Sequence, residues 1–173
     1  GVVMIMDEVI CGFRLSRGGA QGRFGIKPDL TTMAKILGGG LPGGAVAGKA
    51  ELINLIEARD AEFNRTRRIS HPGTFNANPL SAAAGNKALE LVATTPVNDT
   101  ADARGTQLKD GLNDLLMRME IPGCSTGVAS LIFLRLGLDP ELADIETNPN
   151  ALADIAKAVN AERDQQFYLS LLN

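Results

Sequence analysis

The chain has 173 residues, a net charge of −3 and 45% hydrophobic side chains, which is typical of a globular protein with a core of its own. The acidic charge, the lack of Trp and the single Tyr argue against a nucleic-acid surface. His71 is the only histidine and no apolar run is long enough for a membrane span, so we expect neither a His-rich metal centre nor a membrane partner. Cys11 and Cys124 lie far apart, which favours a reducing, cytoplasmic setting without disulfides.

The first segment predicts a buried strand. Residues 2–6 form a continuous apolar run, the pattern of a parallel strand covered on both faces. Asp7 follows at the carboxyl end, where open α/β sheets place their ligand sites. Alternation along the strand directs Glu8 away from Asp7, so we interpret Glu8 as structural. A domain seldom begins with its central strand, and we therefore expect the chain to be a fragment of a longer protein.

Lys35 follows a second predicted strand, residues 30–33, and precedes the glycines 38–40. No charged residue lies within five positions of Lys35 on either side. An amine in such surroundings loses hydration, which lowers its pKa and makes it a candidate Schiff-base nucleophile. The alternative is a surface lysine in front of a flexible loop.

Capping residues, helix and strand breakers and hydrophobic periodicity predict the remaining elements of the first half. Asn78 and Pro79 begin a helix by capping and first-turn chemistry, and small residues at 81–85 suit close packing. The other predictions are a loop at 14–25, a strand at 45–47, a helix at 51–58, an exposed basic loop at 59–72 and a helix end near residue 92.

The break at residues 94–96 is the predicted domain boundary. An amphipathic helix is expected at 99–119, with Leu108, Leu112, Leu115 and Leu116 on one side. Further elements are a strand at 125–136 with Leu131, Phe133 and Leu136 inward, an acidic loop at 139–149 and an amphipathic helix at 151–172.

Asp7 and Lys35 together match the needs of one cofactor. Each residue follows a short apolar strand, and two parallel strands would bring both to one edge of a sheet. Pyridoxal phosphate needs a lysine for its aldehyde and an acid that keeps its ring nitrogen protonated. The protonated ring withdraws electrons from the α-carbon of an amino substrate.

Four segments in this order resemble the class III pyridoxal-phosphate aminotransferases, closest to the glutamate-1-semialdehyde 2,1-aminomutase branch. Residues 1–95 carry the resemblance strongly and the rest weakly. The segments are Met6-Asp-Glu-Val-Ile-Cys-Gly-Phe-Arg14, Pro28-Asp-Leu-Thr-Thr-Met-Ala-Lys35, Gly38-Gly-Gly-Leu-Pro-Gly-Gly-Ala45 and Gly73-Thr-Phe-Asn-Ala-Asn-Pro-Leu80.

The resemblance implies an α/β fold, namely part of the aspartate-aminotransferase-like, fold type I large domain at 1–95 and an incomplete α+β C-terminal small domain at 96–173. It implies that Asp7 pairs with the pyridinium nitrogen and Val9 packs on the ring. Lys35 would form the Schiff base and carry the proton between carbons. Thr74 would reach the cofactor phosphate of the other subunit in a homodimer.

Two departures leave the exact reaction open. Many class III aminotransferases have Gln at the position of Ile10, and its absence favours the aminomutase-like branch. Conversely, His71-Pro72 and the basic insert at 59–68 do not resemble the aminomutase. The substrates are expected to be an amino acid or amino-aldehyde and a carbonyl partner, and the amino group would move either within one molecule or between two.

Several alternatives compete with this reading. The chain could be a non-catalytic remnant, because the family's phosphate loop and ring-stacking aromatic lie upstream of these motifs, and we expect the isolated chain to be inactive. Residues 43–49 match most of a P-loop, but Ala50 replaces its Ser or Thr. His71 is interpreted as a loop residue rather than a base, and the cysteines as packing residues rather than nucleophiles. The arginines at 59–68 form a solvated face or, alternatively, recognise a carboxylate.

Overall fold

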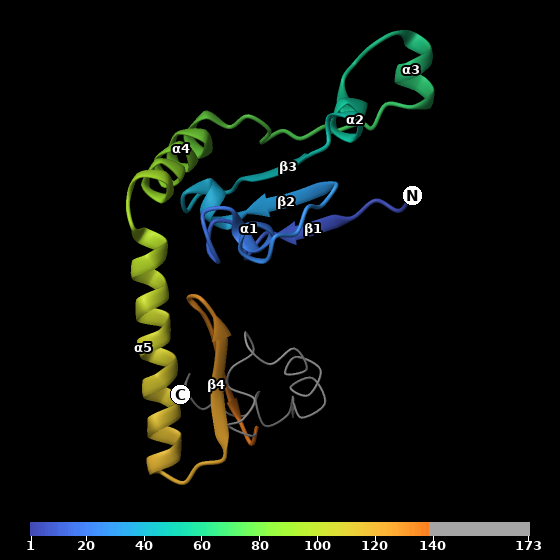
Figure 1. Cartoon of the computed structure of the whole chain (residues 1–173). Helices are drawn as coiled ribbons and strands as arrows, with labels where there is room; N and C mark the ends of the chain where they lie inside the picture. Colours follow the sequence, from blue (N-terminus) through green and yellow to red (C-terminus); the bar gives the residue numbers. More distant parts are fainter. Residues whose placement is uncertain (139–173) are drawn as a thin grey trace. The chain divides into compact units, whose positions relative to one another are not determined.

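The computed structural model describes residues 1–138, which divide between two compact units (Figure 1). The first unit covers Gly1–Asn98 and the second begins at Asp99. No helix within residues 1–138 is long and apolar enough to cross a membrane. The predicted acidic loop and the last predicted helix lie outside the described residues.

A three-stranded sheet organises the first unit. It consists of β1 (Ile5–Glu8), β2 (Leu30–Ala34) and β3 (Gly44–Gly48), with β2 in the centre (Figure 1). β1 and β2 run parallel with Asp7 beside Thr32, whereas β2 and β3 run antiparallel. The carboxyl ends of β1 and β2 therefore meet at one edge of the sheet, and the predicted second and third strands are confirmed.

The prediction of a buried strand at residues 2–6 is wrong for this chain. β1 begins at Ile5 and includes Glu8, and the exposed fractions of Val2 and Ile5 are 96% and 60%. Among the described residues, β2 is the only strand that pairs with β1, so β1 is an edge strand. An apolar run indicates that a strand suits burial, but the number of its neighbours is a tertiary property.

A short helix, α1 (Gly19–Phe24), interrupts the predicted loop at 14–25. The buried carboxylate of Glu8 accepts backbone hydrogen bonds from Ala20 and Gln21, at 2.9 and 2.8 Å. Two charge-assisted bonds satisfy helix donors that would otherwise lack partners. The predicted structural role of Glu8 is therefore confirmed.

The helix α4 (Pro79–Thr94) packs closely against a 3-10 turn, η1 (Lys35–Gly38), which follows β2. Asn78 caps α4 by accepting from the backbone N–H groups of Leu80 and Ser81, as expected. A Cβ atom on Gly85 would collide with the carbonyl oxygen of Leu37. The predicted small-residue packing is thus confirmed.

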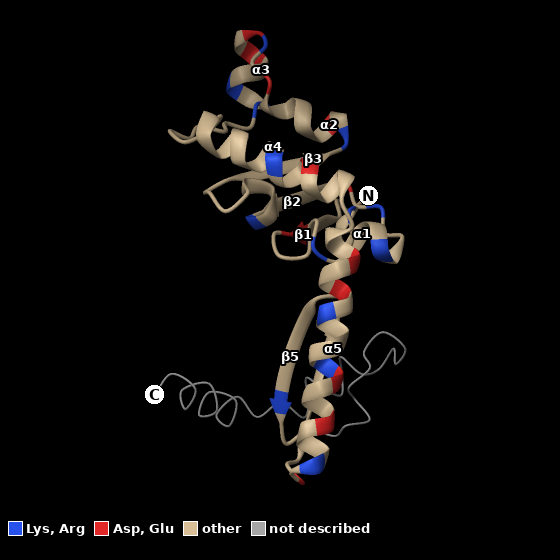
Figure 2. Cartoon of the chain, turned by 90° about the vertical axis from the view of Figure 1, so that its left-hand side faces the viewer, with Lys and Arg blue, Asp and Glu red and all other residues tan. Residues whose placement is uncertain are grey.

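Residues 50–70 differ from the prediction. The expected helix at 51–58 is one α-helical turn, α2 (Ala50–Ile53), followed by the 3-10 turn η2 (Asn54–Ile56). The expected basic loop contains a helix, α3 (Ala61–Thr66), which begins where Asp60 accepts from the backbone N–H of Phe63 at 2.8 Å. An aspartate at this position is a local signal for the start of a helix, which the prediction overlooked because the stretch is rich in arginine. Figure 2 shows acidic and basic residues side by side on α3.

The long helix α5 (Val97–Arg118) leads into the second unit, where β4 (Gly123–Val128) and β5 (Leu131–Leu136) form an antiparallel hairpin. A single strand was predicted there, which is wrong because the chain reverses at Ala129, with φ of 55°. Alanine rarely adopts this conformation, so the sequence offers no turn signal.

The side chains of the second unit also depart from the predicted pattern. On α5, Leu116 is buried, whereas Leu108 is 55% exposed. Phe133, which was expected to point inward, is 49% exposed. Instead, the Asn113 side chain exchanges two hydrogen bonds with the backbone of Ser125, at 2.6 and 3.1 Å. A polar bridge between helix and strand thus contributes to packing that the leucines were expected to provide.

Candidate active site

Asp7 and Lys35 lie at the same edge of the sheet. Asp7 is the next-to-last residue of β1, and Lys35 is the first residue after β2. Asp7 is adjacent to Thr32 in the parallel register, and Lys35 follows three positions later. Strands are roughly 5 Å apart and rise roughly 3.3 Å per residue, so the two Cα atoms are on the order of 10 Å apart. A small molecule with the size of one aromatic ring and a substituent can bridge this separation to the lysine side chain.

The carboxylate of Asp7 is oriented by two donors and open at its second oxygen. Oδ1 accepts from the backbone N–H of Val9 at 2.9 Å and from the hydroxyl of Thr32 at 3.3 Å. No residue in the described range 1–138 donates to Oδ2, and the side chain is exposed. This geometry leaves one carboxylate oxygen available to a cationic donor.

Lys35 combines an unusual backbone with an accessible amine. Its φ is 51°, in the left-handed region that a residue with a Cβ seldom adopts. Strain of this kind concentrates at functional sites, where surrounding structure enforces it. The side chain is exposed and makes no ion pair with any described residue, so the predicted desolvation is not present in this chain. What the structure provides is an unpartnered amine on a constrained backbone.

Thr74 lies in an exposed turn before α4. The backbone of Asn76 donates to Gly73 at 3.0 Å, and the Asn76 side chain donates to the carbonyl of His71 at 3.2 Å. The Thr74 hydroxyl has no hydrogen bond to any residue in the range 1–138. No hydrogen bond or ion pair within residues 1–138 joins Thr74 to Asp7 or Lys35. The structure therefore places three of the four predicted residues, Asp7, Val9 and Lys35, at one sheet edge and leaves Thr74 without a bond to them.

A cavity of about 650 Å³ lies between this turn, the glycine-rich loop and α4. Its lining includes Leu37, Pro42, Phe75 and Ser81. His71 also lines the cavity, in the exposed loop position that the sequence predicts. Neither Asp7, Lys35 nor Thr74 contributes to it.

Comparison with known proteins now decides the family. A family model for class-III aminotransferases matches residues 1–126. A glutamate-1-semialdehyde 2,1-aminomutase from Methanococcoides burtonii is 40% identical over 139 residues, which cover 80% of this chain and 31% of the relative. The chain belongs to the class-III aminotransferase family.

Solved structures agree with this assignment. An omega-transaminase from Sphaerobacter thermophilus superposes with a TM-score of 0.73 at 36% identity, over 94% of this chain and 33% of the other. A transaminase solved with pyridoxal phosphate bound has a TM-score of 0.66 at 29% identity, over 78% and 30%. The described α/β structure is therefore part of the fold type I architecture of this family. The chain spans about a third of the length of the relatives it matches.

The P-loop alternative is not compatible with the structure of this family member. Residues 44–48 form the strand β3, and Lys49 forms an ion pair with Asp29 at 2.6 Å. The hydrogen bond from Lys49 lowers the pKa of Asp29, with a further contribution from the backbone N–H of Met4. The same pair raises the pKa of Lys49. Lys49 therefore has a structural partner and does not follow a phosphate-binding loop.

The cysteines fit the packing interpretation. Cys124 is fully buried, and Cys11 is half-buried beside the end of β1. Burial raises the pKa of the Cys11 thiol, and the nearby charges of Glu8 and Asp7 raise it further. A thiol in an acidic, partly buried position stays protonated and is a poor nucleophile.

Sequence reasoning missed Thr32, the residue that donates to Asp7. The available signal was its place on the strand after Asp7, but the contact depends on the register between β1 and β2. Val9 was expected only to pack on the ring of the cofactor. In the structure its side chain is half-buried, and its backbone N–H is the other donor to Asp7.

Proposed function

We propose that this chain is part of a pyridoxal-phosphate-dependent aminotransferase or 2,1-aminomutase. Lys35 provides the amine that binds the cofactor's aldehyde, and Asp7 accepts a hydrogen bond from the ring nitrogen. The observation that supports this best is the position of two groups at one edge of the sheet. One is a carboxylate oxygen of Asp7 that accepts no hydrogen bond from residues 1–138, and the other is the Lys35 amine, which has no partner among them. The side chain of Val9, next to Asp7, is proposed to contact the ring.

The residues have distinct chemical tasks. The bound cofactor supplies an electron sink for the negative charge that develops on the substrate's α-carbon. Asp7 keeps the proton on the ring nitrogen, because an anionic acceptor stabilises the charged form. Once substrate replaces it, the Lys35 Nζ is a mobile base that can take a proton from one carbon and deliver it to another.

The remainder of the active site is proposed to come from outside this chain. The chain covers about a third of its relatives, so the complete enzyme would contribute the phosphate loop and the aromatic that stacks on the ring. The domain assignment of residues 1–95 to the large domain and 96–173 to the small domain belongs to this proposal. Residues 28–35 and 73–80 would thus act within a longer, cytoplasmic protein.

A homodimer with shared active sites completes the proposal. Thr74 would donate to the phosphate of a cofactor bound in the partner subunit. An exposed hydroxyl without a described partner, in a turn that precedes a capped helix, suits this role.

Labelling of the purified complete enzyme tests the proposal. With pyridoxal phosphate, the protein should absorb in the visible range, and borohydride should attach the cofactor irreversibly to Lys35 in a peptide map. Lys27, which is also exposed, is the internal control and should remain unlabelled. Label on another lysine would overturn the site assignment, and a protein without cofactor would support the non-catalytic remnant instead.

The dimer is tested separately. Thr74→Ala should weaken cofactor retention about tenfold, the effect of losing one charge-assisted hydrogen bond, without changing the sedimentation coefficient. Thr94→Ala is the matched control, because its hydroxyl bonds to the carbonyl of Glu90 within α4. A fully active monomer would contradict the proposal.

The reaction type requires a substrate test. A panel of amino acids with carbonyl acceptors distinguishes intermolecular transfer from isomerisation of an amino-aldehyde. Product formation without an added acceptor would indicate the aminomutase reaction.

A further inference from the structure

The two hydrogen bonds on Asp7 fall on the same oxygen. Val9 and Thr32 both donate to Oδ1, and no described residue donates to Oδ2. We propose that Thr32 is a positioning residue for Asp7, whose hydroxyl fixes the carboxylate so that Oδ2 faces the ring nitrogen of the bound cofactor. This inference rests on the proposed function and adds a residue to its site.

The sheet register makes the contact between the two side chains a consequence of the fold. Asp7 and Thr32 are direct neighbours in the parallel pair, so their side chains lie on the same face. Thr32 is half-buried on the central strand, where Val46 of β3 is its neighbour on the other side. Threonine is branched at Cβ, which restricts χ1. The direction of its hydroxyl is therefore set by the sheet rather than by a flexible arm.

Two donors on one oxygen restrict rotation of the carboxylate. A turn about χ2 of Asp7 would break the bond from the Val9 N–H and the bond from the Thr32 hydroxyl together. The backbone donor fixes the carboxylate relative to its own turn, and the hydroxyl fixes it relative to β2, the strand that leads to Lys35. Such support keeps an acceptor in the productive orientation before the ligand arrives.

The neighbouring threonine supplies a matched control. Thr31 is buried on the opposite face of β2, and its hydroxyl accepts from the side chain of Gln21 at 3.3 Å. It resembles Thr32 in residue type, strand and hydrogen-bond length, but it does not contact Asp7. Replacing either threonine by valine removes one hydroxyl and retains the shape.

The experiment uses the complete enzyme and pyridoxal phosphate. We expect Thr32→Val to weaken cofactor binding about two- to tenfold, the range for one hydrogen bond, in a titration followed by visible absorbance. With an isotopically labelled ring nitrogen, its NMR shift should move toward the unprotonated value. Thr32→Ser should restore both readouts, and Thr31→Val should leave both unchanged.

A double-mutant cycle separates positioning from a structural effect. If Thr32 acts through Asp7, Thr32→Val should have no further effect on the labelled nitrogen in an Asp7→Asn background. A wild-type NMR shift in Thr32→Val, or an equal change in Thr31→Val, would overturn the inference alone. Thr32→Ser remains informative if Thr32→Val does not fold, since a serine variant without the wild-type shift also overturns it. A wild-type protein that binds no cofactor overturns both the inference and the proposed function.

Discussion

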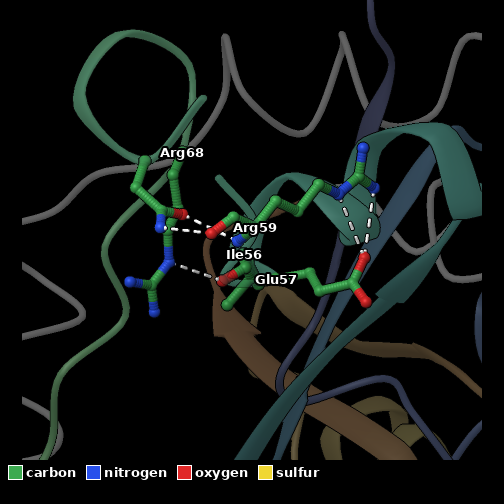
Figure 3. A network of polar contacts seen from close by, with 5 residues as sticks. Ile56, Glu57, Arg59 and Arg68 are labelled. Atoms are coloured by element: carbon green, nitrogen blue, oxygen red, sulfur yellow. Dashed lines mark hydrogen bonds and ion pairs between the residues drawn. The ribbon is translucent and has the colours of Figure 1, made fainter. Parts of the chain in front are cut away.

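Two exposed parts of the first unit differ in whether their polar groups have partners. We call Asp7 and Lys35 the strand-end site, and residues 57–69 the arginine segment. In the strand-end site, one carboxylate oxygen and one amine have no partner among the described residues. In the arginine segment, several charged groups bond to atoms of the same segment or its immediate neighbours (Figure 3).

Several polar groups of the arginine segment find their partners within the segment or next to it. The Arg59 guanidinium bonds to Glu57 at 3.1 Å and lies 4.6 Å from the centre of the Phe63 ring. Arg68 donates from Nε to the carbonyl of Ile56 at 3.0 Å (Figure 3). Asp60 caps α3. These contacts explain why a basic stretch folds locally, and they favour the predicted solvated face over carboxylate recognition.

The comparison shows that exposure alone does not identify a functional charge. Both regions are exposed, yet only the strand-end site combines open polar groups with a strained backbone at Lys35. A polar group that is held in one orientation by hydrogen bonds and still has a free acceptor, such as Asp7, is a better candidate for ligand binding than a segment with many charges.

The largest expected effect comes from the amine. Lys35→Ala should lower turnover by about 10²–10⁴, because it removes the proposed base and attachment point. Arg59→Ala, from the arginine segment, should change turnover by no more than about twofold, as for most surface substitutions. Both are measured as amino transfer with the cofactor in excess. A comparable loss in Arg59→Ala would remove the distinction between the two regions.

Asp7→Asn is expected to have the next largest effect. Asparagine retains an oxygen for Val9 and Thr32 but carries no charge for the ring nitrogen, so turnover should fall about 10²–10³ while the fold persists. Asp60→Asn is the control, since asparagine caps helices as well as aspartate. Steady-state rates and circular dichroism provide the two readouts. Wild-type turnover in Asp7→Asn would contradict the electron-sink mechanism.

A smaller effect concerns the packing beneath Lys35. Gly85→Ala places a methyl group against the Leu37 carbonyl in the turn that Lys35 begins, and overpacking should destabilise the fold by about 1–3 kcal/mol. Gly111→Ala, in α5 with no atom near the new methyl, should stabilise it by up to about 1 kcal/mol. Both glycines lie inside helices, so the difference in melting temperature isolates the packing. Equal shifts would show that the contact is not tight.

The smallest effect is expected from the ion pair between Asp29 and Lys49. The pKa of Asp29 is lowered, so the pair stabilises the fold above the ordinary aspartate pKa and loses this contribution as the pH falls through the lowered value. The raised pKa of Lys49 means that the contribution also ends at alkaline pH. Asp29→Asn should therefore melt slightly earlier than wild type at neutral pH and equally in acid. A difference that persists in acid would indicate another cause.

Local chemistry in the sequence was sufficient for several elements and for the candidate residues. The Asn78 cap, the small residues around Gly85 and the short strands β2 and β3 follow from side-chain size, capping and strand propensity. Asp7 and Lys35 were recognisable because each follows an apolar strand, and their roles remain predictions.

Tertiary structure decided the features that depend on partners distant in the chain. The exposure of β1 reflects the number of its neighbouring strands, and the reversal at Ala129 is imposed on a residue without turn preference. The pairing of Thr32 with Asp7 requires the parallel register, which no local pattern encodes. The sequence by itself determined which groups can carry the chemistry, and the local turn at Val9 occupies one oxygen of Asp7. The sheet decided that Thr32 donates to the same oxygen and leaves the other open, because a donor on one strand reaches an acceptor on another only when the two strands pair.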